Sequence, residues 1–269
     1  MKTILMHVHD DDSLEGRFQT ALSLTRAAGG HLSCLHVTPV EAYAMFNSFS
    51  GVFVMSDILE IINEHATGLQ QRIEERLRKE DISWDYVERT GPITNTIVTR
   101  AALADAIVTA RETDALSPIT FFGDLLHRSR TPLIIPPVKG KAYDPTGIAL
   151  VAWNGSYEAA NAVRGALGAL KLAQNVVVVR VETKAEKDAL FPATELLEYL
   201  SRHEIHAKLR AIESVNEGVT ATILECAKEI DATLLVIGGY SHGRLGEYVF
   251  GGVTRDLLIK SPICLLVAH

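Results

Sequence analysis

Cysteine is scarce in this chain, and its distribution argues against a disulfide framework. The 269 residues include three cysteines, Cys34, Cys226 and Cys264, which lie far apart and are each followed by an apolar residue. An odd number of distant cysteines in apolar surroundings is typical of buried thiols rather than of disulfides or a cysteine-based metal site. We therefore expect a cytoplasmic protein.

Long apolar runs and clustered positive charge are also missing. No apolar run approaches the roughly 18 residues that a membrane span requires, and the first nine residues turn polar before the apolar part of a leader peptide could form. The net charge is −7, and no segment carries the excess of lysine and arginine that binding to a nucleic-acid backbone needs. The sequence predicts neither a membrane partner nor a nucleic-acid partner.

The motifs of nucleophilic catalysis and phosphoryl transfer are absent from the sequence. It contains no Gly-x-Ser-x-Gly elbow, no cysteine paired with a histidine in a strand-to-helix turn, and no Gly-x-x-x-x-Gly-Lys-Ser/Thr loop. Without that lysine, phosphoryl transfer lacks its usual charge neutralisation. We expect no enzyme, and the catalytic alternative is slow ATP hydrolysis or autophosphorylation at Ser241 or Thr254.

What the sequence does contain is a repeated unit. The composition, 47% hydrophobic and 22% charged, is that of a globular protein. Short apolar strands are predicted at 4–8 and 148–152, and each is followed by a polar turn and an alanine- and leucine-rich helix, at 14–28 and 157–170. Ser13 and Ser156 are the predicted N-caps of these helices. Second strands follow at 31–37 and 175–181, so both strand pairs lie 144 residues apart.

Later elements match at a shorter offset. The strand at 105–111 corresponds to 231–238, and that at 131–136 to 261–267. The first half has about eighteen additional residues, in which apolar residues from Ile58 to Leu77 recur at helical spacing. A linker rich in proline, glycine and charge covers 136–145. We place one domain at 1–140 and a second at 141–269.

Near-continuous apolar strands that alternate with helices are typical of parallel sheets covered on both faces. The fold class is therefore α/β, and we expect two doubly wound parallel five-stranded sheets flanked by helices. Ligands of such sheets bind beyond the carboxyl ends of the strands.

Glycines gather where such a ligand would lie in the second half. The apolar strand ending at Gly238 continues into Gly239-Tyr-Ser-His-Gly243, and Gly251-Gly-Val-Thr254 follows. Glycine lets main-chain N–H groups approach an anion, and a helix starting at Val253 or Thr254 would add the positive end of its dipole. The pattern predicts a nucleotide site, although the same glycines could simply end a strand and let a helix pack closely.

This combination of a strand, an Asn-Gly-Ser turn, Ser-His-Gly, Gly-Gly-Val-Thr and a closing Ser-Pro-Ile-Cys-Leu-Leu-Val strand resembles the universal stress protein family, in its tandem form with two nucleotide α-hydrolase-like domains. The family signature is Gly, two residues, Gly, nine residues, Gly, then Ser or Thr. Here the first glycine is Tyr240, the spacer has seven residues, and Gly252 replaces the final hydroxyl residue. The nucleoside-contacting aspartate of the family corresponds to Asn154, which carries no charge.

The resemblance implies an adenine nucleotide such as ATP, with Mg²⁺ as its candidate companion, bound in the C-terminal half. Arg244 and Arg255 lie nearby in sequence as candidate phosphate partners. It assigns the nucleotide to Asn154, Val181, Gly239, Tyr240, His242, Gly243, Gly251, Gly252, Val253 and Thr254.

The first half has lost this signature, because Gly123 is the one glycine in the corresponding stretch of 111–126. We expect it to serve packing or partner choice. Its other notable cluster is His7, His9 and His36 with the acidic run 10–12. These residues could hold a divalent metal, but a core histidine and a solvated turn explain them as well, and we predict no metal site.

Three functions remain open. The first is a cytoplasmic, non-enzymatic stress-response protein that binds adenine nucleotide. The second is a ligand-free interaction or chaperone-like module, and the third is the slow ATPase or autophosphorylating protein. The resemblance also implies that the last strands of the two halves, 133–136 and 263–267, pair antiparallel within the chain. A homodimer through terminal strands or domain faces is expected.

Overall fold

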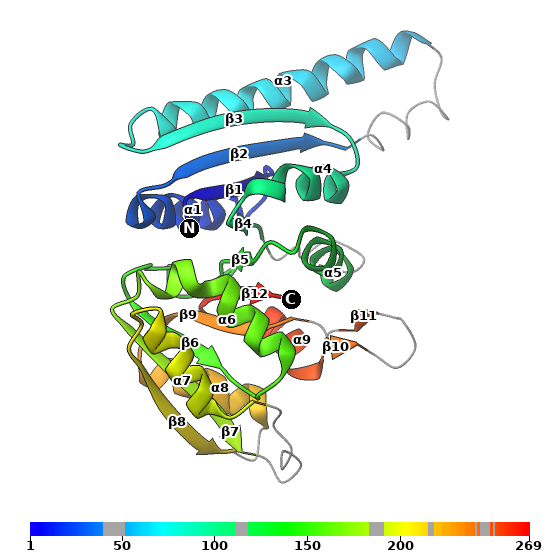
Figure 1. Cartoon of the computed structure of the whole chain (residues 1–269). Helices are drawn as coiled ribbons and strands as arrows, with labels where there is room; N and C mark the ends of the chain where they lie inside the picture. Colours follow the sequence, from blue (N-terminus) through cyan, green and yellow to red (C-terminus); the bar gives the residue numbers. More distant parts are fainter. Residues whose placement is uncertain are drawn as a thin grey trace.

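The computed structural model describes residues 1–39, 52–110, 118–182, 191–214, 218–239, 241–242, 248–249 and 251–269. Strands and helices alternate along both halves around a central sheet (Figure 1). The N-terminal half contains β1 (Thr3–Val8), α1 (Leu14–Ala28), β2 (His31–Thr38), α3 (Val52–Leu77), β3 (Ser83–Thr90), α4 (Ile93–Arg100), the 3₁₀ helix η1 (Ala101–Leu103), β4 (Ala106–Val108), α5 (Pro118–Ser129) and β5 (Leu133–Ile135). The C-terminal half contains β6 (Ile148–Ala152), α6 (Tyr157–Leu170), β7 (Asn175–Glu182), α7 (Ala193–Arg202), β8 (Ala207–Glu213), α8 (Val219–Glu229), β9 (Ala232–Gly238), β10 (Ser241–His242), β11 (Tyr248–Val249), α9 (Gly252–Lys260) and β12 (Cys264–Ala268).

The central sheet has ten strands in the order β3-β2-β1-β4-β5-β12-β9-β6-β7-β8. Neighbouring strands within each half are parallel, as the apolar runs predicted. At the centre, β5 and β12 pair antiparallel with Ile134 opposite Leu266, which confirms the predicted pairing of the last strands.

This pairing makes the prediction of two separate five-stranded sheets wrong. Each half has its five parallel strands, but β5 and β12 would be edge strands with unpaired N–H and C=O groups if the halves stood apart. Their side chains are fully buried, so water could not satisfy those groups. Pairing the two edges satisfies them and joins the strands into one continuous sheet.

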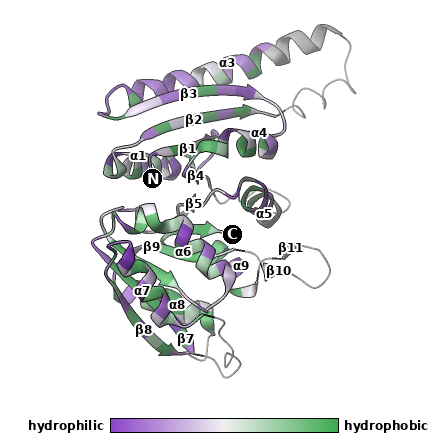
Figure 2. Ribbon diagram, in the orientation of Figure 1, coloured by the Kyte–Doolittle hydropathy of each residue, from purple (hydrophilic) through white to green (hydrophobic). Residues whose placement is uncertain are grey.

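The core consists of two layers, one on each face of the sheet. One apolar cluster lies beneath α1, α3, α6 and α7, and the other beneath α4, α5, α8 and α9. Each cluster includes residues from both halves, so the halves share both layers. Figure 2 shows hydrophobic residues concentrated on the central strands, whereas the edge strand β3 is largely hydrophilic. Trp153 belongs to this core, and Trp84 and Tyr86 pack against it.

The first helix of each half begins and ends where the sequence predicted, but the two starts differ. The Ser156 hydroxyl accepts a hydrogen bond from the Ala159 N–H at 3.2 Å and caps α6. Ser13 makes no such bond within the described part of the chain, because its backbone is already helical at φ −96° and ψ −3°. Its own N–H instead donates to Asp11 at 2.7 Å. The predicted side-chain cap is therefore wrong for Ser13.

The predicted linker lies against the C-terminal half. The Lys141 N–H donates to the Pro262 carbonyl at 3.0 Å, and a Cβ atom at Gly140 would lie 2.0 Å from that oxygen. Gly140 has φ +147°, so this close approach needs a residue without a side chain. All three cysteines are buried thiols, as predicted. None of the described helices combines the length and apolarity needed to cross a bilayer.

Candidate functional site

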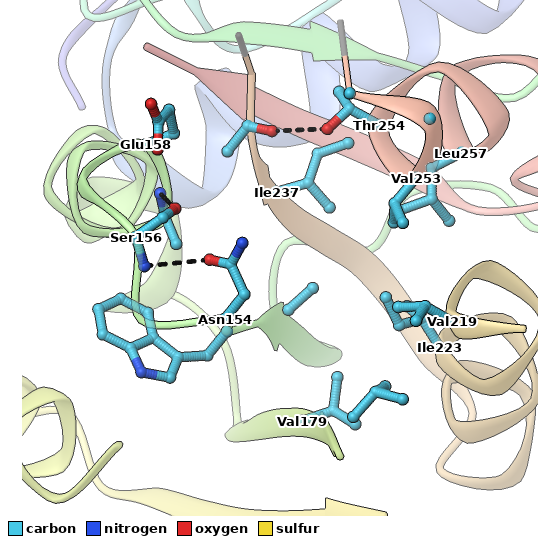
Figure 3. A pocket seen from close by; sticks show the side chains of 17 residues that line it. Asn154, Ser156, Glu158, Val179, Val219, Ile223, Ile237, Val253, Thr254 and Leu257 are labelled. Carbon is cyan, nitrogen blue, oxygen red and sulfur yellow. Dashed lines mark hydrogen bonds between the residues drawn. The ribbon is translucent and has the colours of Figure 1, made fainter. Parts of the chain in front are cut away.

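A pocket of about 260 Å³ opens at the carboxyl ends of β6, β7 and β9, where the N-termini of α6, α8 and α9 converge (Figure 3). This is the edge at which parallel α/β sheets bind their ligands. The pocket forms because each strand ends in a turn while the next helix starts beside it. The N-termini of α6, α8 and α9 therefore border the same space.

The inner wall of the pocket is apolar. Val179 and Val181 come from β7, Ile237 from β9, Ile223 from α8 and Leu257 from α9. Figure 3 shows several of these side chains facing the pocket from opposite sides. A slot between aliphatic side chains suits a flat, weakly polar ring, because burial there removes apolar surface from water on both sides of the ring.

Asn154 supplies a directed donor at the mouth of this slot. Its Oδ1 accepts a hydrogen bond from the Ser156 N–H at 3.1 Å. Only an oxygen can accept that hydrogen, so the amide orientation is fixed and Nδ2 points toward the pocket (Figure 3). The side chain therefore offers a ligand N–H groups, whereas an aspartate would offer a carboxylate.

The charged side chain in the described lining of the pocket is acidic. Glu158, in the first turn of α6, lines it, and no lysine, arginine or histidine is among the described lining residues. The positive potential at the pocket therefore comes from helix N-termini alone, as far as the described residues extend.

The N-terminus of α9 is open. Gly251 holds the N-cap position, and no side chain of the described residues caps it. The first N–H groups of a helix have no partner within it, so those of Gly252, Val253 and Thr254 are available to an anion. A Cβ atom at Gly251 or Gly252 would meet no described atom within 4 Å. These glycines leave room in the pocket rather than serving a special backbone conformation.

Thr254 plays a different part from the one that the sequence suggested. Its hydroxyl donates to the Gly238 carbonyl at 3.0 Å and ties α9 to the end of β9 (Figure 3). The hydroxyl proton is therefore used within the protein. The helix also starts one residue before the predicted Val253.

Six of the ten predicted site residues line this one pocket: Asn154, Val181, Gly251, Gly252, Val253 and Thr254. Gly239 lies elsewhere, since its N–H donates to the Ala268 carbonyl at 2.9 Å and a Cβ atom there would meet Val267 and Leu126. His242 belongs to β10, whose backbone pairs with β11. Tyr240, Gly243 and Arg244 fall outside the described residues. Arg255 is exposed on α9 and does not line the pocket.

Sequence reasoning missed the part of the wall that comes from α8. Val219 and Ile223 lie one turn apart at the start of that helix and close the slot opposite α6. The available signal was Gly218, a helix-start residue followed by apolar residues at helical spacing. Glu158 was also missed, although its place two residues after the capping serine could have indicated it.

Two histidines of the N-terminal cluster, His7 and His36, are buried, whereas His9 is exposed. His7 is 4% exposed and its ring stacks on that of His9, with centroids 6.1 Å apart. Burial lowers the pKa of His7 to about 3, and the charge of Arg17 contributes further. Burial also lowers the pKa of His36. Among the described residues, no three histidine, cysteine or acidic side chains are grouped as metal ligands.

Comparison with known proteins gives the fold of the chain and a family match for its C-terminal half. Residues 147–269 match the model of the Universal stress protein family. The whole chain is similar to a universal stress protein from Archaeoglobus fulgidus DSM 4304, with a TM-score of 0.73, 16% identity, and coverage of 99% of this chain and 98% of that chain. A functionally unknown protein from Pseudomonas aeruginosa PAO1 has a TM-score of 0.62 at 16% identity, with 100% and 92% covered. No curated protein sequence matches significantly. At these identities the solved structures establish the fold alone.

Proposed function

We propose a nucleotide-binding, non-enzymatic stress-response role for this chain, which belongs to the universal stress protein family through its residues 147–269. The ligand is ATP or a related adenine nucleotide, and its site is the pocket at the ends of β6, β7 and β9. The single observation that carries the proposal is the meeting of an apolar slot with the open N-terminus of α9 in one pocket.

In this arrangement the base occupies the aliphatic slot and the phosphates lie at α9. Val181 and Ile237 pack against the ring, while Asn154 Nδ2 donates to an acceptor on the nucleoside. The N–H groups at the start of α9 donate to a phosphate. Because the lining includes the carboxylate of Glu158, a polyphosphate needs a counter-charge, and we propose that Mg²⁺ accompanies it.

The same residues support binding rather than turnover. The Thr254 hydroxyl, the one candidate phosphate acceptor in the pocket that the sequence suggested, already donates to the Gly238 carbonyl. Phosphoryl transfer requires charge neutralisation and an oriented nucleophile together. We therefore propose a sensor or carrier of nucleotide, with hydrolysis no faster than in a control protein.

Calorimetry with ATP and Mg²⁺ tests the proposal when a Gly251→Val variant is compared with Gly68→Val. Both glycines have open space around an added Cβ, but Gly251 lines the pocket while Gly68 lies within α3. We expect saturable binding by the wild type and by Gly68→Val, and at least a tenfold loss in Gly251→Val with its circular dichroism unchanged.

Two outcomes would overturn the proposal. A folded wild type that releases no heat with ATP, ADP or AMP has no such site. Equal affinities of the two valine variants would put the nucleotide elsewhere. Phosphate release above that of buffer at high protein concentration would refute the non-enzymatic part alone.

We also propose that the chain forms a homodimer through its outer faces. The strands β5 and β12 already pair with each other within one chain, so they cannot pair with the same strands of a second chain. Leu103 and Ile259 are large apolar residues with exposed fractions of 90% and 59%, on opposite halves. Light scattering after size exclusion tests this: a dimer mass that falls to the monomer mass in a Leu103→Glu/Ile259→Glu variant supports it, and a wild-type monomer refutes it.

A further inference from the structure

A second hollow lies at the junction of the two halves, outside the nucleotide pocket. It measures about 680 Å³ and is lined by the end of α5, the loop before β5, α6, α7 and the end of β12. Its polar lining comes from both halves: His127 and Arg130 from the first, and Asn161 and Arg164 from the second. The halves are in close contact here, since a Cβ atom at Gly165 would lie 2.9 Å from the Pro132 ring.

A smaller apolar hollow of about 150 Å³ adjoins it between α6 and α7. Its walls are formed by Trp153, Val163, Phe191 and Leu196. Arg164 and Tyr199 line both hollows, so the two are adjacent, and we refer to the pair as one groove, apolar at one end and polar at the other. Trp153 donates its indole N–H to the Phe191 carbonyl at 3.3 Å, which fixes the apolar end.

The charge in this groove is unbalanced. No described carboxylate lies within 4.0 Å of the guanidinium groups of Arg130 or Arg164, and the one side-chain hydrogen bond of Arg164 is a long contact of 3.4 Å to Asn161. Among the described lining residues, the acidic side chain is that of Glu195, which lines the apolar hollow and not the junction hollow. A bound anion is therefore attracted to the junction end and repelled from the other.

We propose that this groove binds an amphipathic anion, a small molecule whose ring or acyl chain fills the apolar hollow and whose phosphate, sulfonate or carboxylate lies between Arg130 and Arg164. Burial of the apolar part removes hydrocarbon surface from water, and guanidinium groups form charge-assisted hydrogen bonds with oxyanions. Because each half contributes one arginine, the ligand would bridge the duplicated units. The proposal is independent of nucleotide binding.

The test uses 8-anilinonaphthalene-1-sulfonate and its uncharged analogue N-phenyl-1-naphthylamine as fluorescent probes with the full chain. We expect one saturable sulfonate site in the wild type. An Arg130→Gln/Arg164→Gln variant should bind the sulfonate at least tenfold more weakly, while its affinity for the neutral probe changes less than twofold. An Arg78→Gln/Arg89→Gln variant has the same net charge change on exposed residues of the N-terminal half, and it should bind both probes like the wild type.

Three results would overturn the proposal. The first is the absence of saturable sulfonate binding by the folded wild type. The second is equal weakening by the two arginine pairs, which would reduce the effect to net charge. The third is competitive displacement of the sulfonate by ATP in the wild type together with loss of sulfonate binding in Gly251→Val, which would assign the probe to the nucleotide pocket.

Discussion

Asp10 in the N-terminal half and Asn154 in the C-terminal half occupy the same position after the first strand, but their partners differ. Asp10 forms an ion pair with Arg72 at 2.5 Å, and the His65 Nε2 lies 3.3 Å from its carboxylate; both partners are on the 26-residue helix α3. Asn154 faces a pocket whose described lining includes no residue of α7, the 10-residue helix that matches α3. The longer helix supplies the first half with its own partners for the carboxylate, whereas the second half leaves its position open to a ligand.

The residues next to these positions also differ: the first half has buried charged or titratable side chains where the second half has neutral ones. Arg17, on α1, is 1% exposed, and its guanidinium pairs with Asp11 at 3.0 Å. The matching residue on α6 is Asn161, which lies at the surface groove. His7 in β1 matches Val151 in β6. The comparison teaches that the parallel α/β fold tolerates two arrangements at the carboxyl ends of its strands. In one half charged side chains of the protein itself occupy this edge, and in the other half the edge contains an open pocket.

The largest effect that separates the halves is expected from Arg17→Ala. It leaves Asp11 without its cation and removes a buried side chain, so we expect the free energy of unfolding to fall by about 3 kcal/mol. This is the lower end of the range for breaking a buried pair, since Asp11 is 30% exposed. Urea unfolding measures it. The matched Asn161→Ala variant should lose less than about 1 kcal/mol, and equal losses would contradict the comparison.

The second effect is a pH dependence that His7→Val should remove. The pKa of His7 is lowered by burial from 6.5 to about 3, so below pH 6.5 the unfolded chain binds a proton that the folded chain does not. Stability is therefore complete above pH 6.5 and falls as the pH drops toward 3. At about 1.4 kcal/mol per pH unit, the loss from this residue between pH 7 and pH 4.5 is about 2.5 kcal/mol.

Urea unfolding of wild type and His7→Val at pH 7 and pH 4.5 checks this difference. The variant carries the residue of the C-terminal half at this position, and its stability should fall less on acidification. His36 has a pKa lowered in the same direction and remains in both proteins, so it cancels from the comparison. If the free energy of unfolding changed with pH by the same amount in the two proteins, His7 would have the same pKa in the folded and unfolded states, which would contradict the prediction.

The third effect is a loss of stability expected where β9 and α6 pack closely in the C-terminal half. A Cβ atom at Gly238 would lie 2.7 Å from the Glu158 carbonyl carbon and 2.8 Å from the Ala159 nitrogen, so Gly238→Ala must separate β9 from α6. We expect a loss of about 2 kcal/mol, as for overpacked cores. The control Gly68→Ala, in α3 with nothing within 4 Å, should instead stabilise the protein by up to about 1 kcal/mol. A Gly238→Ala protein as stable as wild type would contradict this packing.

Sequence alone predicted the elements whose burial pattern is strong. The helices at 14–28 and 157–170 have the predicted bounds, because each has a polar turn before it and apolar residues at helical spacing. No bounds were predicted for the edge strands β3 and β8, since their residues are largely polar and carry no apolar run. Composition and periodicity did not predict that the two sheets join into one. The joining depends on the pairing of two edge strands, β5 and β12, that are far apart in the sequence.

At the site, the sequence predicted which segments would form the pocket but not which of their residues would face it. Gly239 follows directly on Gly238, yet it lies against β12 and α5, because adjacent residues at a strand end point to opposite sides. The partner of the Thr254 hydroxyl is a carbonyl sixteen residues earlier in the chain, a contact that no local pattern encodes. The prediction therefore failed where a residue's role depends on contacts with residues far away in the sequence, not where it depends on residue type.

The smallest effect tests that hydroxyl directly. Thr254→Val keeps the shape of the side chain and removes the bond to the Gly238 carbonyl, so we expect a loss of about 1 kcal/mol in the free energy of unfolding. Because the hydroxyl proton is used within the protein, affinity for ATP should change less than threefold, and Thr254→Ser should restore stability. Urea unfolding and calorimetry on the three proteins measure both quantities. If Thr254→Val instead loses tenfold or more in affinity with little change in stability, the hydroxyl turns to the phosphate when nucleotide binds, and the C-terminal half uses its threonine as the family signature implies.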